Sequence, residues 1–294
     1  MKRKAAAIVS VFFITLFLIS SVYADNGKNF LWKVQSETNT VYLLGSVHFM
    51  KKDIYPLNKK IEEAFEKADI LAVEANVNDI GQIDMQQLMS TAFYPGEETL
   101  EKHVSRETYE LILKESGKIG FPQVIIDKQR PWFLALTLTS LELLREGFDP
   151  DFGIDMHFLS KASGKKKIRE LESAEYQIRL LSGFSDDEQE AFLLYTIKDL
   201  SSLKGDLDTL LRAWSTGDTK TMESLITKSI AEDKGMSSMF EKLINKRNSD
   251  MVTKIEGFLQ AKETCFVIVG AGHLVGERGI VELLKKKGYK LEQL

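Results

Sequence analysis

The sequence is poor in residues that constrain a chain covalently or conformationally. Its 294 residues include one cysteine, Cys265, so no disulfide can form within the chain and the fold depends on its core alone. Only five prolines occur, and no run rich in serine and glycine, which predicts one continuous domain without a flexible linker. The net charge of −4 provides no basic field that would favour nucleic acid or an anionic membrane surface.

Several familiar catalytic motifs are also absent. The chain contains no H-E-x-x-H of zincin metallopeptidases, no G-x-x-x-x-G-K-[ST] phosphate loop and no G-x-S-x-G nucleophile elbow. Cys265 lies inside an apolar run, where a thiol is a poor nucleophile. Any chemistry must therefore come from other side chains, chiefly histidines and carboxylates.

The first 24 residues predict a secretory signal peptide. Residues 2–4 are basic, residues 5–22 are mostly apolar, and Val-Tyr-Ala at 22–24 resembles a cleavage site. We expect a mature domain over 25–294 that is exported, either periplasmic or secreted. An uncleaved anchor helix is the alternative, because about 18 apolar residues approach the length of a membrane span. No second long apolar run occurs, so no span is expected after signal removal.

Both ends of the mature chain alternate between strand and helix patterns, as is typical of an α/β fold. Phe30–Val34 and Thr40–Gly45 flank a polar turn and predict a hairpin, and a helix at 57–67 then leads to a strand at Ile70–Val73. At the other end, the predicted strand, helix and strand are Cys265–Val269, Gly279–Lys287 and Tyr289–Leu291. These patterns predict a central mixed sheet with βαβ units at both ends of the chain.

The middle of the chain, from about 84 to 257, is predicted to be a large helical insertion. Pro131 suits the first turn of one helix, and Ser185 with Glu188 forms a capping box for another. Helical spacing then continues without a clear break as far as Trp214. One weak apolar run, Lys167–Leu171, predicts a strand within the insertion.

Two predicted strands end in the same pattern, G-x-x-H. Gly45 precedes His48 after one strand, and Gly270 precedes His273 after another. Sites in open α/β sheets form beyond the carboxyl ends of strands, and we expect each glycine to turn the chain with φ > 0 and aim the histidine inward. Glu74, which also follows a strand, would add a carboxylate, so the three side chains are candidate ligands of one metal ion.

A nucleotide-binding loop is the competing interpretation of Gly270, Gly272 and Gly276. The third glycine comes one position late for G-x-G-x-x-G, and only 18 residues follow it. Too little chain remains for the second half of a dinucleotide-binding fold. We therefore interpret Gly45, Gly270 and Gly272 as loop glycines that position the histidines.

An ordered set of segments resembles the TraB/GumN family over about Phe30 to Leu294: LWKVQSETNTVYLLGSVHF, ILAVEAN, RPWFLALTL, FGIDMHFL, ELESAEYQ, NKRNSDM and VIVGAGHLVGERGIVELLKKKGY. That family is similar to the Tiki proteases and, more remotely, to the haem-binding ChaN and erythromycin-esterase folds. The resemblance implies that His48 and His273 are the motif histidines, that Glu74 is the family glutamate and that Arg247 is the family arginine. In the Tiki branch these groups are associated with a divalent-metal-dependent peptidase activity that favours manganese or cobalt, and by resemblance we infer such an activity here.

Other polar residues are weighed separately. Glu172 follows the weak strand as Glu74 follows its strand, so it is a candidate for the same crevice. Asp155 and His157 lie two positions apart and would point away from each other on a helix, so Asp155 is the candidate site residue and His157 is expected to be structural. Arg130 is a further candidate, and salt-bridging is its alternative role. His103 lies in a charged stretch and is expected to be exposed.

These observations predict an exported metal-dependent hydrolase that acts on peptides or proteins. His48, His273 and Glu74 would hold a divalent metal, manganese or cobalt being favoured and zinc remaining open. Glu74 or Glu172 would act as general base, and Arg247 would stabilise the oxyanion. The alternatives are a non-catalytic protein that sequesters a peptide or haem-like ligand, and a scaffold without a ligand. The substrate and the oligomeric state stay open.

Overall fold

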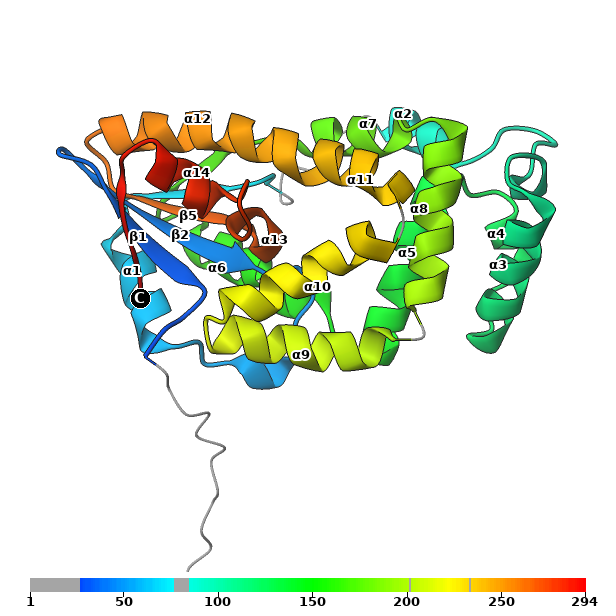
Figure 1. Ribbon diagram of the computed structural model, residues 1–294, viewed down its shortest axis with the longest axis horizontal. Coiled ribbons are helices and arrows are strands. Elements are labelled where there is room, and N and C mark those ends of the chain that lie inside the picture. The colour runs from blue at the N-terminus through cyan, green and yellow to red at the C-terminus, as the bar shows by residue number, and fades with distance from the viewer. Residues whose placement is uncertain (1–26, 77–84, 201, 233) are drawn as a thin grey trace, which may run out of the picture.

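The computed structural model describes residues 27–76, 85–200, 202–232 and 234–294 (Figure 1). The predicted signal peptide, residues 1–24, lies outside the described residues, so both interpretations of it stay open. In the part that is described, no helix is long and apolar enough to cross a membrane.

A six-stranded mixed sheet lies towards one end of the molecule, with the strand order β4-β3-β5-β2-β1-β6 (Figure 1). β2 and β3 both pair with β5 in parallel, and β4 pairs with β3 in parallel, whereas β1 is antiparallel to both of its neighbours. The predicted mixed α/β sheet and its N-terminal hairpin are therefore confirmed. The strands are β1 Leu31–Gln35, β2 Thr40–Ser46, β3 Ile70–Val73, β4 Lys167–Glu170, β5 Cys265–Gly270 and β6 Lys290–Gln293.

Helices make up most of the remaining described chain. The α-helices are α1 Lys59–Lys67, α2 Met85–Ala92, α3 Arg106–Lys118, α4 Gln123–Ile126, α5 Pro131–Arg145, α6 Ile154–Ala162, α7 Ala174–Ser182, α8 Asp186–Asp199, α9 Leu203–Ser215, α10 Thr219–Glu232, α11 Lys234–Phe240, α12 Lys246–Gln260, α13 Ala271–Leu274 and α14 Ile280–Lys286. The short 3-10 turns are η1 Lys52–Ile54, η3 Leu100–Lys102 and η4 Pro150–Phe152, and η5 Glu241–Asn245 is a π-helical turn between α11 and α12. Pro131 begins α5 and the capping box of Ser185 begins α8, as the sequence predicts. The helices α3, α4, α5 and α8 lie beyond the sheet (Figure 1).

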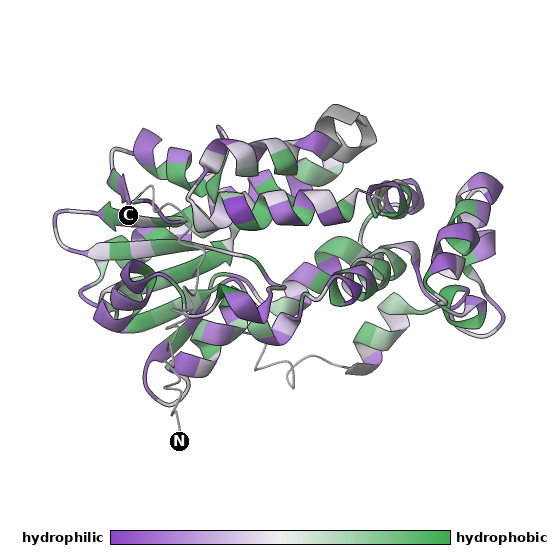
Figure 2. Ribbon diagram, turned by 90° about the horizontal axis from the view of Figure 1, so that it is seen from below, coloured by the Kyte–Doolittle hydropathy of each residue, from purple (hydrophilic) through white to green (hydrophobic). Residues whose placement is uncertain are grey.

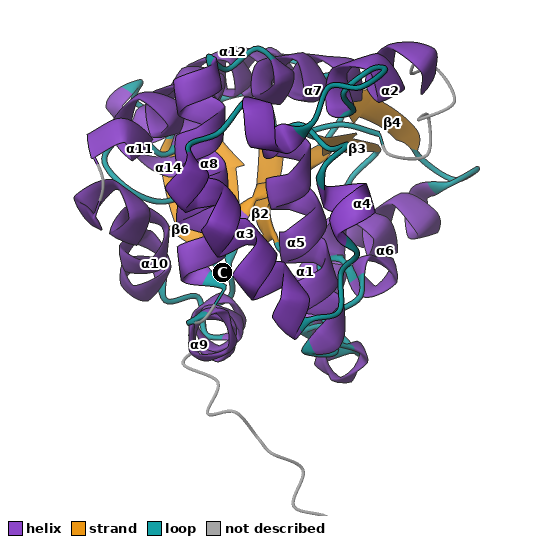
Figure 3. Ribbon diagram, turned by 90° about the vertical axis from the view of Figure 1, so that its right-hand side faces the viewer, coloured by secondary structure: helices purple, strands orange, loops and turns teal. Residues whose placement is uncertain are grey.

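The sheet lies between two layers of helices. α12 and α14 cover one face, and α1 and α6 cover the other (Figures 1 and 3). Figure 2 shows mostly hydrophobic strands that lie between helices carrying both hydrophilic and hydrophobic residues. This sandwich explains why the central strands are apolar throughout: a strand buried on both faces has no solvent side to alternate with.

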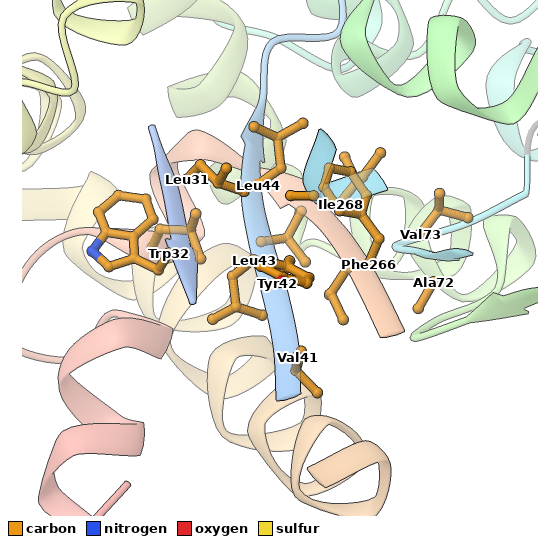
Figure 4. Close-up of a cluster of buried hydrophobic side chains, with 14 of the residues drawn as sticks. Leu31, Trp32, Val41, Tyr42, Leu43, Leu44, Ala72, Val73, Phe266 and Ile268 are labelled. Atoms are coloured by element: carbon orange, nitrogen blue, oxygen red, sulfur yellow. The ribbon is translucent and has the colours of Figure 1, made fainter. Parts of the chain in front are cut away.

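The core side chains interlock across the strands (Figure 4). β2 and β5 are almost wholly buried, and Leu43, Leu44 and Ile268 are fully excluded from solvent. On the face covered by α1 and α6, the Phe266 ring lies 5.6 Å from that of Phe65 and 5.1 Å from that of Phe158. The apolar packing fixes the register of β2 and β5, and it thereby fixes where their ends lie.

The continuous helix expected from Ser185 to Trp214 is wrong, because the structure contains two helices there. α8 ends at Asp199 and α9 begins at Leu203, and the N–H of Ser202 turns back to the Asp199 carbonyl. The two halves bury their apolar faces in different places. Ile197 of α8 joins a cluster formed with α3 and α5, whereas Trp214 of α9 joins the core around the sheet. The chain must change direction between these two cores.

Gly45 is required for a different reason from the one predicted. Its φ is not positive, and a Cβ atom at this position would overlap the ring of Phe30. The Gly45 carbonyl also accepts a 2.7 Å hydrogen bond from the indole of the buried Trp214. The glycine therefore allows close packing at the end of β2 and does not provide a left-handed turn.

We expect Gly45→Ala to destabilise the fold by about 1–3 kcal/mol, because the added methyl group overpacks the core against Phe30. Gly257→Ala is the matched control, since Gly257 is exposed within α12 and nothing lies within 4 Å of its added Cβ. That change should stabilise the protein by about 0.5–1 kcal/mol. Urea unfolding measures the free energy of unfolding of wild type and both variants. Equal values for the two variants would refute the packing argument.

Candidate functional site

The carboxyl ends of the parallel strands bring the predicted site residues together. Ser46 at the end of β2 lies opposite Gly270 at the end of β5, and Val73 at the end of β3 lies opposite Ile268. His48, His273 and Glu74 follow these ends and line one cavity of about 290 Å³. We call it the edge cavity; its other lining residues are Gln177, Leu180, Leu181, Leu243, Ile244, Arg247, Gly270 and Gly272.

Gly270 lies where the three side chains converge. A Cβ atom at this position would be 3.3 Å from Glu74 Oε1, 3.5 Å from His273 Cδ2 and 3.9 Å from His48 Nε2. The φ of Gly270 is −50°, so the predicted left-handed turn is wrong here as well. Any side chain would crowd the Glu74 carboxylate, which accepts a hydrogen bond from the Gly270 N–H.

His273 is buried and is held as a neutral imidazole. Its Nδ1 donates a 2.6 Å hydrogen bond to Asn248 Oδ1, and the amide of Asn248 is itself oriented by donating to the Arg278 carbonyl at 2.9 Å. This tautomer leaves the lone pair on Nε2, which lies 3.7 Å from Glu74 Oε1. Burial lowers the pKa of His273 to about 4, although the Glu74 carboxylate opposes the shift.

His48 has the opposite environment. Its side chain is 61% exposed, and its Nδ1 donates to Asp155 Oδ2 at 2.7 Å. The same carboxylate oxygen accepts a hydrogen bond from the Ser46 hydroxyl. The Asp155 charge raises the pKa of His48 to about 9, against the opposing effect of desolvation. Water around the exposed ring screens part of this attraction.

Arg247 connects two buried carboxylates. Its Nη2 donates to Glu74 Oε2 at 2.9 Å and to Glu172 Oε2 at 2.7 Å, and its Nε contacts both oxygens of Glu172. Gln177 Nε2 donates to the same two carboxylates at 3.2 and 3.1 Å. Burial alone would raise the pKa of Glu74, but His273, His48, Arg247 and the Gly270 N–H outweigh it, so its pKa lies below the usual range.

Both oxygens of Glu172 are occupied by Arg247, and Glu172 does not line the edge cavity. It is therefore placed to hold Arg247, whereas Glu74 faces the cavity directly. Asp155 does not line the cavity either and reaches it only through His48.

The remaining candidates lie away from the edge cavity. The Arg130 guanidinium lies over the Tyr94 ring at 4.9 Å, at the start of α5. His157 contacts Glu62 at 3.2 Å and does not line the edge cavity, in the structural role expected. His103 is half-buried and stacks on Tyr94 with ring centroids 4.4 Å apart, so the expected exposure is wrong. Cys265 is fully buried, and burial raises its pKa to about 12.

Two site residues were missed from the sequence. Asn248 fixes the tautomer of His273, and Gln177 bridges the two carboxylates. Asn248 directly follows Arg247 in the NKRNSDM segment, so its position in a family segment marked it as a possible site residue. The pattern does not indicate which group the Asn248 amide would hydrogen-bond. Gln177 lies on α7 with no distinguishing motif.

The imidazole nitrogens and the carboxylate oxygen at the edge cavity are atom types that bind divalent cations. His48 and His273 each hold Nδ1 in a hydrogen bond and direct Nε2 towards the edge cavity, the usual arrangement of metal-binding imidazoles, and Glu74 adds a carboxylate oxygen. Across the described ranges, however, no three His, Cys, Asp or Glu side chains are grouped closely enough to hold an ion as they stand. Binding would thus require side-chain movement, which the exposed His48 permits, and loss of the Nε2 proton of His48.

Comparison with known proteins agrees with the motif pattern. The model of the TraB/PrgY/gumN family matches residues 30–293. YbaP of Escherichia coli is 24% identical over 278 residues, which cover 92% of this chain and 99% of YbaP. A metalloprotease TIKI homolog of Amphimedon queenslandica is 23% identical and metalloprotease TIKI2 of Danio rerio is 20% identical. This chain covers 62% and 61% of those two proteins. No solved structure matches, so the likeness to ChaN and erythromycin esterases is not confirmed.

We expect Asp155→Asn to lower the pKa of His48 from about 9 towards its ordinary value of 6.5, because the attraction of the carboxylate is lost. The pKa of His273, about 4, should stay low, because burial causes it. NMR titration of the ring protons in metal-free protein measures both values. Asp151→Asn is the control, as Asp151 is exposed and close in sequence. A wild-type His48 that titrates near 6.5 would contradict the Asp155 assignment.

Proposed function

This chain belongs to the TraB/PrgY/GumN family, and from that membership we propose that it is a peptidase whose edge cavity hydrolyses peptide bonds. The observation that carries the proposal is the convergence of His48 Nε2, His273 and Glu74 Oε1 around Gly270. Two relatives named as metalloproteases, at 23% and 20% identity, support the reaction class.

His48, His273 and Glu74 would hold the divalent ion, manganese or cobalt by preference and zinc as the alternative. When bound, such an ion supplies a water of lowered pKa and polarises the scissile carbonyl. The protein supplies the setting: Asn248 keeps Nε2 of His273 unprotonated, and Arg247 keeps Glu74 ionised inside a buried site.

Glu74 is also the proposed general base; in that role its Oε1 is the proton acceptor and the two histidines alone would hold the ion. Its Oε1 faces His273 and the edge cavity, and its lowered pKa means that the carboxylate is ionised, and so present as a proton acceptor, at neutral pH. Glu172, with both oxygens on Arg247, is proposed to position that arginine and not to exchange protons.

Arg247 is proposed to bind the carbonyl oxygen that becomes negative in the transition state. Its Nη1 donates to the Leu243 carbonyl at 2.8 Å, and no second acceptor for Nη1 is found among the described residues. One N–H group therefore remains for substrate beside the cavity wall. A preorganised charged donor of this kind stabilises an oxyanion without having to reorient.

The cavity dimensions favour a peptide over a haem-like ligand. About 290 Å³ is just below the range of roughly 300–1,000 Å³ that is typical of small-molecule sites. An extended peptide needs to place only the scissile bond and a neighbouring side chain in such a space, whereas a macrocycle must enter whole.

We expect His273→Ala and Glu74→Gln to lower peptide hydrolysis by about 10²–10⁴-fold, the usual contribution of a group that activates water. His103→Ala is the control, because His103 lies away from the edge cavity. Mass-spectrometric mapping of a peptide pool after addition of Mn²⁺, Co²⁺ or Zn²⁺ gives the rates, and elemental analysis gives the bound metal.

A wild-type protein that binds none of these ions and cleaves no peptide would rule out the hydrolase. A His273→Ala variant that keeps full metal content would show that His273 is not a ligand. Metal binding without cleavage would favour the non-catalytic binding protein.

Export is a further part of the proposal, and it rests on the signal-like pattern of residues 1–24. We expect the processed protein to begin at Asp25 and to be recovered outside the cytoplasm. N-terminal sequencing of the exported fraction checks this. A chain that keeps residues 1–24 and sediments with membranes would instead support the anchor helix.

A further inference from the structure

A second cavity shares a wall with the edge cavity. It has a volume of about 200 Å³ and lies between α10, the π-turn η5 and the chain that follows α13. We call it the side pocket. Ile244 and Gly272 line both cavities, so the side pocket begins one residue away from His273.

The shared wall is thin for identifiable reasons. Three consecutive residues of the π-turn lie along this wall. Leu243 lines the edge cavity, Ile244 lines both cavities, and Asn245 lines the side pocket. π-turns within α-helices are rare and occur frequently at functional sites. On the opposite side, a Cβ atom on Gly272 would lie 3.0 Å from Ile226 Cδ1, so a larger residue would have to displace the wall.

The described residues of the side pocket combine apolar walls with one unpaired negative charge. Ile226, Phe240 and Val275 supply half-buried apolar surface. Glu223, also half-buried, places its Oε1 3.4 Å from the position of a Cβ on Gly276, whose φ is +85°. Over the described residues, the Glu223 carboxylate has neither an ion pair nor a side-chain hydrogen bond.

The other charges of the side pocket are already compensated or exposed. Arg278 donates to both oxygens of Glu241, at 2.5 and 2.8 Å. Glu277 is 91% exposed and lies 3.8 Å from Lys286. Among the described residues that line the side pocket, the charge left for a ligand is therefore negative and belongs to Glu223.

We propose that the side pocket binds the basic side chain, lysine or arginine, of the substrate residue next to the scissile bond. This inference rests on the proposed peptidase function and names its substrate class. The aliphatic stem of such a side chain suits the surface of Ile226 and Val275, and its cationic end suits the Glu223 carboxylate. Because the Arg278 carbonyl also holds Asn248, a filled side pocket supports the same loop that positions His273.

The test uses the full-length protein with peptides of alanine and glycine that carry one lysine, arginine, norleucine or glutamate. We expect wild type to cleave next to lysine or arginine roughly 10- to 100-fold faster than next to norleucine, the usual range for a charge-assisted contact. Glu223→Gln should abolish this preference, and Glu223→Lys should reverse it in favour of glutamate. Glu292→Gln is the control, because it makes the same charge change on an exposed residue outside the side pocket.

Binding of the same peptides, labelled and measured by fluorescence anisotropy, separates this inference from the peptidase proposal. Binding that prefers lysine and depends on Glu223, without cleavage, would support the proposed ligand of the side pocket and contradict the peptidase proposal. Cleavage with equal rates for lysine and norleucine would overturn the side pocket and leave the peptidase standing. A protein that neither binds nor cleaves any of the peptides would overturn both.

Discussion

The site depends on the hydrogen bonds that the Arg247 guanidinium donates to Glu74 and Glu172. Glu74 follows β3 and Glu172 follows β4, and two carboxylates buried at neighbouring strand ends would repel each other without a shared cation. Arg247 comes from α12, so the ion cluster ties a helical layer to the sheet edge. Asn248, the next residue, turns to a different face of α12 and holds His273. Two adjacent helix positions thus organise the carboxylates and the imidazole.

The two G-x-x-H motifs look equivalent in sequence but differ in chemistry. His48 is exposed and paired with Asp155, which raises its pKa to about 9, whereas His273 is buried and its pKa falls to about 4. Both nevertheless use Nδ1 as a donor and keep Nε2 towards the edge cavity. Environment therefore gives one histidine that can be charged and one that stays neutral, from the same local pattern.

The sequence predicts the convergence of His48, Glu74 and His273 because each follows an apolar run, and parallel strands share an edge. β3 even begins and ends where its apolar run does, at Ile70–Val73. Non-local contacts were not predictable. The glycines proved necessary for close packing against Phe30 and Glu74, and the break between α8 and α9 depends on two separate cores. Asn248 and Gln177 were missed because helical spacing does not identify what a polar side chain meets.

Burial of charge argues that this edge is functional and not merely structural. Ion pairs in an interior contribute little net stability, because desolvation offsets their attraction, and apolar residues would often serve as well. Of the buried Glu and Arg residues in the described chain, Glu74, Glu172 and Arg247 lie here; Glu142 lies elsewhere, paired with the half-exposed Arg145. The strands that lead to this edge are apolar, so apolar residues could also have occupied their ends. A fold that instead keeps a buried carboxylate ionised beside a neutral imidazole holds both groups in the unprotonated forms that can accept a proton or a cation.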